Sequence, residues 1–287
     1  MGSQPTLPDR PPLTLTLGWL CATTWLVALI VGAVAPRISA AAQEIQALLL
    51  LLFMLFHASA TYGVWGLGLF ALIVGLVSFA MEASSIAAGF PFGYYVHHLP
   101  GPRVLSVPLG VVIGWIVLGW FGWTLARLIA RRDPAAPTRT DRFLTPLIGT
   151  FLLGGYDLVA DPVDATVHAL YSYHFPSGLF GVPLVNFLGW LLTGWLLMQL
   201  FALVEPRLPV RPVVERKGYW LGPVLIWLVM PVTDIAEFLR AGTATVAVGE
   251  RSFLVSDVLE SAISCALFTT VTTSALGLVR LFSASER

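Results

Sequence analysis

The sequence predicts an all-α fold: a polytopic bundle of about eight transmembrane helices, forming a single integral-membrane domain over residues 1–287. Hydrophobic residues make up 57% of the chain and charged residues only 11%, whereas soluble domains are roughly 25% charged. Several apolar runs reach the ~20 residues that a helix needs to cross the ~30 Å apolar core of a bilayer. The runs are continuous rather than alternating, which argues against a β-barrel.

Each predicted span is one of these apolar runs, bounded by polar residues, proline or glycine. The first run is followed by small residues, "ISAAAQ", which also resemble the cleavage site of a signal peptide. We expect a retained helix instead, because the run is long and Asp9 cancels the charge of Arg10 before it. The predicted spans are 13–34, 43–60, 66–86, 105–129, 143–160, 183–204, 218–239 and 253–279.

Basic residues favour one orientation of this bundle. Loops rich in Lys and Arg tend to remain in the cytoplasm, and the two richest loops lie at 127–142 and 207–217. Eight spans then place both termini on the same side, where twelve of the sixteen Lys and Arg residues collect. We therefore predict a multi-pass protein of the cell (cytoplasmic) membrane with both termini inside. The net charge of zero gives no indication of a nucleic-acid partner.

Acidic residues gather at the opposite, non-cytoplasmic edge. Half of the sixteen acids and four of the five histidines fall in segments predicted to lie there. Ionisable groups at membrane depth are costly and commonly mark a functional interior. The acids are Glu82, Asp157, Asp161, Asp164, Asp234, Glu237, Asp257 and Glu260.

Spacing brings like charges together in the segment "YDLVADPVD" (156–164). Asp157 and Asp161 are four residues apart, so they share one face of a helix. Two carboxylates with little water around them cannot both ionise cheaply, and we expect one of them to keep its proton near neutrality. A carboxyl group that keeps its proton can act as a general acid.

The proline in this segment permits a second interpretation. Asp161 can be the N-cap of a new helix, with Pro162 at its first position and Asp164 in its first turn. His168 lies four residues after Asp164, so the two side chains form either a proton relay or an ordinary hydrogen bond at a helix end.

An aromatic loop is predicted at "GFPFGYYVHHLPGP" (89–102), because its glycines and prolines exclude a regular helix. Its aromatic residues, Phe90, Phe92, Tyr94 and Tyr95, either form an interfacial belt or close over an apolar ligand. Irregular backbone at membrane depth is tolerated only where protein buries it or water reaches it. The span at 183–204 opens with Asn186, which either orients a water or satisfies a backbone carbonyl. Gly189 and Gly194 permit close helix contact there.

Three motifs in chain order, "E…GFPFGYY…GP", "YDLVADPVD" and "FGVPLVNFLGW", resemble the CruF-type integral-membrane carotenoid biosynthesis proteins. This family includes carotenoid 1,2-hydratases and bisanhydrobacterioruberin hydratases. The resemblance covers roughly residues 80–195, and one difference is Tyr171-Ser172-Tyr173, where a Trp-x-Trp pair is expected. The matching positions are Glu82, Gly93, Tyr95, Asp157, Asp161, Pro162, Pro183, Asn186 and Trp190.

The resemblance implies hydration of the terminal C=C bond of a membrane-embedded acyclic carotenoid, through protonation to a tertiary cation that water captures. Asp157 or Asp161 is then the expected acid, with Glu82 second. The other carboxylate, Asn186 or His168 holds the water, and Asp164 completes the catalytic set. The expected substrate-binding residues are Phe90, Phe92, Tyr94, Tyr95, Tyr171, Tyr173 and Trp190. We expect no cofactor and no metal, since the reaction needs no redox group and the sequence has no glycine-rich dinucleotide fingerprint.

Three other functions compete with hydration. A carotenoid cyclase or isomerase uses the same protonation but quenches the cation internally. A proton-coupled transporter or lipid-binding protein also uses intramembrane acids. A membrane metal hydroxylase needs clustered histidines, whereas His97-His98 is a lone doublet.

Overall fold

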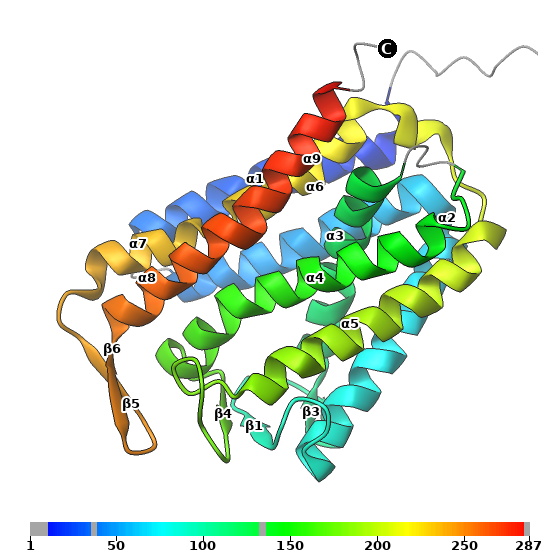
Figure 1. Cartoon of the computed structure of the whole chain (residues 1–287). Helices are drawn as coiled ribbons and strands as arrows, with labels where there is room; N and C mark the ends of the chain where they lie inside the picture. The colour runs from blue at the N-terminus through cyan, green and yellow to red at the C-terminus, as the bar shows by residue number, and fades with distance from the viewer. Residues whose placement is uncertain (1–10, 36–38, 132–135, 284–287) are drawn as a thin grey trace, which may run out of the picture.

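The computed structural model describes residues 11–35, 39–131 and 136–283 and has the predicted all-α architecture (Figure 1). Seven helices within these residues are long and apolar enough to cross a membrane. One of them, α2 (Ser39–Ala88), contains both predicted spans 43–60 and 66–86. Gly63 interrupts α2 with a φ of 70°, a conformation that glycine adopts readily. The two halves of α2 run in different directions, so the eight predicted spans lie in seven helices (Figure 1).

The other spans follow the predicted order with small shifts of their ends. The segments Lys217–Ala241 and Val255–Ser283 each combine two shorter helices. The helices are α1 (Leu13–Val34), α3 (Leu109–Ala130), α4 (Asp141–Pro162), α5 (Leu184–Val204), α6 (Lys217–Val229), α7 (Val232–Ala241), α8 (Val255–Ala266) and α9 (Thr272–Ser283), with π-helical turns η2 (Val163–Val167) and η5 (Leu267–Val271) and 3-10 turns η3 (Glu205–Arg207) and η4 (Pro212–Glu215).

Within the described part of the chain, three short antiparallel strand pairs gather at one end of the bundle, away from the end of α9 (Figure 1). The pair that matters for the site joins β1 (Tyr95–His97) to β4 (Tyr171–Tyr173). The other pairs are β2 (Arg103–Val104) with β3 (Val107–Pro108), and β5 (Thr245–Val248) with β6 (Arg251–Leu254). The aromatic loop predicted at 89–102 therefore contains a strand, which fixes it against the segment after α4.

The beginning of α1 and the end of α9 lie at the same end of the bundle (Figure 1). The Trp19 indole donates to the carbonyl of Gly218 at 3.1 Å, and the Lys217 ammonium lies 5.3 Å from the ring centroid of Phe282. At the other end, Arg240 donates to the carbonyl of Ala33. The described chain thus brings both terminal helices to the end that holds the arginine-rich segments.

Two arginines assigned to a loop by the sequence are inside the bundle. Arg127 and Arg131 are buried, and both lie against the buried carboxylate of Glu205. The Arg131 Nη1 donates to Glu205 Oε1 at 2.9 Å, and the Tyr62 hydroxyl donates to the same oxygen. Burial is possible because Glu205 compensates the charge. The sequence analysis counted both among the basic residues of the loop 127–142, whereas Arg127 lies in α3 and Arg131 directly follows it. Arg132 lies outside the described residues.

The alternative in which Asp161 caps a new helix is also wrong. The helix α4 continues through Asp161 and Pro162 without a break, and then widens into the π-helical turn η2. Proline has no N–H to donate, and a π-helical turn is one way for a helix to accommodate such a lost bond. Neither Asp161 nor Asp164 caps a helix here, and both are free to face other elements.

Candidate active site

Two aspartates on one face of α4 form the centre of the site. Asp157 is fully buried and Asp161 is 7% exposed. Their carboxyl groups lie close together, because both contact the same donor. The amide of Asn186, near the start of α5, donates to both: Nδ2 lies 3.0 Å from Asp157 Oδ2 and also contacts Asp161 Oδ2. The other oxygen of Asp157, Oδ1, is buried and has no hydrogen-bond partner among the described residues.

Two tyrosines of β4 face Asp161. Because side chains alternate along a strand, Tyr171 and Tyr173 point to the same side while Ser172 points away. The Tyr171 hydroxyl donates to Asp161 Oδ1, and the Tyr173 hydroxyl donates to Oδ2 at 3.1 Å. Burial, reinforced by the nearby Asp161, raises the pKa of both tyrosines well above the usual value. Both phenols therefore remain donors, and Asp161 has two more partners than Asp157.

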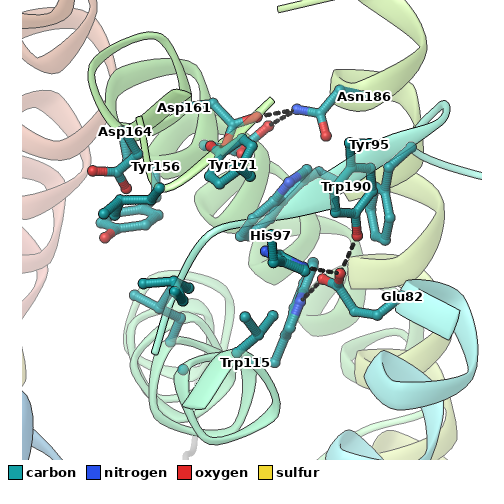
Figure 2. Close-up of a pocket in the computed structure, with 18 of the residues that line it drawn as sticks. Glu82, Tyr95, His97, Trp115, Tyr156, Asp161, Asp164, Tyr171, Asn186 and Trp190 are labelled. Atoms are coloured by element: carbon teal, nitrogen blue, oxygen red, sulfur yellow. Dashed lines mark hydrogen bonds and ion pairs between the residues drawn. The ribbon is translucent and has the colours of Figure 1, made fainter. Parts of the chain in front are cut away.

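A third carboxyl group, that of Glu82 near the end of α2, lies on the opposite side of the site (Figure 2). Its oxygens accept from the Trp115 indole at 2.8 Å and from the Tyr95 hydroxyl, and lie 3.2 Å from His97 Nε2. Burial and Glu82 together raise the pKa of Tyr95 well above the usual value. Strand β1 carries Tyr95 and His97 on one face, and so the β1–β4 pair supplies donors to both carboxyl clusters.

A cavity of about 170 Å³ separates the two clusters. Its walls are largely aromatic, and the rings of Trp115 and Trp190 stack with centroids 4.0 Å apart. Figure 2 shows Asp161 and Asn186 on one side, with Glu82, His97 and Trp115 on the other. The lining residues are Glu82, Phe92, Tyr95, His97, Leu99, Val111, Gly114, Trp115, Leu118, Tyr156, Asp157, Ala160, Asp161, Asp164, Leu170, Tyr171, Tyr173, Asn186 and Trp190.

The aromatic loop reaches this cavity because Gly189 leaves room for it. A Cβ at Gly189 would lie 2.5 Å from the Phe92 ring and 2.8 Å from the Pro91 carbonyl oxygen. Gly189 thus gives room to the aromatic loop and not, as the sequence had suggested, to a neighbouring helix. Gly194 does face a helix, α4, where a Cβ would lie 3.6 Å from the Cα of Thr150. The Phe92 amide also donates to Ser85 Oγ at 2.8 Å, which anchors the loop to α2.

Most of the predicted site residues line the cavity, but three do not. Phe90 and Tyr94 are 57% and 41% exposed, and Tyr94 stacks on His174 outside the cavity. The third, His168, lies just beyond it. Two of the acids in the predicted cluster, Asp257 and Glu260, are exposed on α8 and lie apart from the site.

The predicted pair of Asp164 and His168 is present and has a further member, Glu237 of α7. His168 Nδ1 lies 3.2 Å from Asp164 Oδ1, and Nε2 lies 3.0 Å from Glu237 Oε2. Hydrogen bonds to the two carboxylates raise the pKa of His168 to about 10. The imidazole is therefore a cation that donates both N–H groups and joins η2 to α7.

Sequence reasoning missed Trp115 and Tyr156. Both lie within apolar runs, where a large aromatic residue is ordinarily core packing. A buried indole N–H usually needs a hydrogen-bond acceptor. A tryptophan inside an apolar span, such as Trp115, therefore indicates a polar partner nearby, which here is Glu82. His97 was considered only as half of a lone doublet, but its position two residues after Tyr95 predicts the same strand face.

Comparisons with known proteins identify the family of this chain. A profile of the family described as "Carotenoid biosynthesis protein" matches residues 42–250, which include every residue that lines the cavity. The bisanhydrobacterioruberin hydratase of Haloarcula japonica is 33% identical over 138 residues, which are 47% of this chain and 44% of that protein. The match thus spans less than half the length of that curated relative. No solved structure matches the chain. The profile covers well over half of the sequence, and the chain belongs to the family of carotenoid biosynthesis proteins.

Proposed function

We propose that this multi-pass membrane protein is a carotenoid hydratase that adds water across the terminal C=C bond of an acyclic carotenoid end group. The observation that carries the proposal is the buried pair Asp157–Asp161, which shares the Asn186 donor and lines a cavity with aromatic walls at one end of an apolar bundle. The name of the Haloarcula japonica relative supports hydration over other carotenoid reactions.

Asp157 is the proposed acid. It is fully buried, it shares the Asn186 donor with a second carboxyl group, and its Oδ1 has no partner among the described residues. Two carboxyl groups this close and this dry do not both ionise cheaply. In the proposed first step, the π electrons of the terminal bond take the Asp157 proton at the less substituted carbon. A tertiary cation forms at the other carbon, and Asp157 becomes a carboxylate. A positioned general acid of this kind contributes typically about 10²–10⁴-fold to rate.

Asp161 is the proposed base, because hydrogen bonds from Tyr171, Tyr173 and Asn186 stabilise its carboxylate form. Water attacks the cation with a lone pair, the C–O bond forms, and Asp161 takes the proton that the water releases. The proton then returns from Asp161 to Asp157, whose carboxyl group lies beside it and shares the Asn186 donor. The balance is one water added per reacted end, with protons only moved, and no redox cofactor takes part.

The wall of the cavity opposite Asp161 is suited to stabilising the tertiary carotenoid cation. Glu82 accepts from Tyr95 and Trp115 and lies beside His97, and the proposal uses its negative charge across the cavity from Asp161. Trp115, Trp190 and the tyrosine rings supply aromatic faces, and each cation–π contact contributes ~0.5–2 kcal/mol. Glu82, the second candidate for the acid, is thus assigned to electrostatic stabilisation.

The orientation of the bundle is part of the proposal. The arginine-rich end faces the cytoplasm of the cell membrane by the positive-inside rule, and the cavity opens near the other face. A carotenoid rod lying along the helices then brings its end group to the acids.

Expression in a lycopene-accumulating bacterium tests the function. The wild-type protein is expected to convert the pigment to products heavier by one water for each reacted end. Asp157→Asn and Asp161→Asn should abolish this mass gain while the protein remains in the membrane. A cyclised product of unchanged mass, or full activity of both variants, contradicts the proposal.

A further inference from the structure

A second, larger cavity of about 550 Å³ lies against the first. The two cavities share four lining residues, Tyr156, Ala160, Asp164 and Leu170, which form the wall between them. In Figure 2, Tyr156 and Asp164 lie together on the side away from Glu82. The second cavity therefore begins directly behind the acid pair.

Its lining is unusually polar for a cavity inside an apolar bundle. Helices α2 and α7 contribute glutamines, a threonine and two acids, and His168 adds a cation. A hydrated cavity needs both room and polar partners for its waters, and this cavity has both. The polar lining residues are Gln43, Gln46, Asp164, His168, Thr233, Asp234, Glu237 and Thr270.

The position of this cavity answers a need of the proposed reaction. Asp157 and Asp161 are almost completely buried, yet each turnover consumes one water. Asp164 lines both cavities. His168 contacts both Asp164 and Glu237, and all three residues line the second cavity. The charged side chains of Asp164, His168 and Glu237 can bind water at the wall between the two cavities.

We propose that the second cavity is a water-filled chamber that supplies the attacking water to the acid pair across the wall of Tyr156 and Asp164. This inference rests on the proposed hydration. It assigns the chamber to water, and a dry cavity occupied by lipid or by the polyene is the alternative that the experiment tests.

Cysteine labelling in native membranes tests the water content directly. Cys21→Ala and Cys265→Ala provide a background without thiols, and Thr233→Cys and Gln46→Cys each place one thiol in the chamber. Thr23→Cys is the matched control, because Thr23 is exposed on the surface of α1 at mid-span. A cationic, membrane-impermeant methanethiosulfonate should modify either chamber thiol about tenfold faster than the control, because thiolate formation needs water. Equal rates for both chamber positions and the control overturn the inference.

Filling the chamber tests water delivery. Thr233→Trp should lower turnover by about tenfold while KM for the carotenoid changes by less than about twofold, because only the water-dependent step is affected. Thr23→Trp should retain wild-type turnover, and wild-type turnover of Thr233→Trp overturns the delivery role. The labelling needs no carotenoid, so its outcome is independent of whether the pigment assay finds hydration.

Discussion

At the scale of single residues, Asp157 and Asp161 differ in their partners. Asp161 accepts from two phenols and an amide, whereas among the described residues Asp157 accepts from the amide alone. The sequence predicted that the two share a helix face and a proton, but it left their roles open. The distinction depends on Tyr171 and Tyr173, which reach Asp161 only because β4 pairs with β1.

The double variant Tyr171→Phe/Tyr173→Phe tests the role of these phenols. A hydrogen bond to a charged group contributes about 1.5–3 kcal/mol, so removing them should lower turnover by at least about tenfold. The rate of carotenoid hydration in membranes, divided by the amount of folded protein, is the measurement. Ser172→Ala on the same strand is the matched control, since Ser172 is exposed and bonds His98 instead. An unchanged rate in the double variant removes the tyrosines from the mechanism.

At the scale of elements, the apolar runs predicted the helices well, because hydropathy over about 20 residues is a strong signal. The strands β1 and β4 were not predicted, since three residues are too few to show an alternating pattern. The continuation of α4 past Pro162 was also beyond the sequence, because "DPVD" fits a helix start equally well. These two features position the tyrosines and keep Asp161 inside the site.

The triad of Asp164, His168 and Glu237 should stabilise the contact between η2 and α7 in a pH-dependent way. The pKa of His168 is raised from 6.5 to about 10. Its contribution is therefore complete below about pH 6.5 and is lost as the pH rises through about 10. The difference in Tm between wild type and His168→Gln in detergent should be largest near pH 6.5 and vanish above about pH 10. His98→Gln, which removes an exposed histidine, should show no such trend. A constant difference for His168→Gln across this range contradicts the assignment.

At the scale of the whole molecule, the bundle has a charged cluster at each end with different roles. The cluster of Glu205, Arg127 and Arg131 is buried among aromatic rings, with the Arg131 guanidinium 5.3 Å from the Trp123 ring centroid. It was not predictable, because arginines next to a loop ordinarily face water. The acids at the other end were predicted to gather, and six of the eight line the aromatic cavity or the polar chamber, whereas Asp257 and Glu260 are exposed on α8.

Glu205→Gln should destabilise the bundle strongly, because it leaves two buried arginines without their counter-charge. Removing one partner of a buried ion pair typically costs about 3–5 kcal/mol, which should appear as a clear drop in Tm measured in detergent. Glu215→Gln, at an exposed position near the same end, should leave Tm nearly unchanged. If both substitutions have equal effects, the buried cluster does not stabilise the fold.

The central claim is that a carboxyl proton and then a water molecule add to one carotenoid double bond. The most direct measurement is turnover of an acyclic carotenoid in water enriched in heavy oxygen and deuterium, followed by mass spectrometry of the product. The account predicts one heavy oxygen and one non-exchangeable deuterium for each reacted end, and neither label in the product of Asp157→Asn. Deuterium without heavy oxygen would show that the cation is quenched internally, and an unlabelled pigment would show that no protonation occurs.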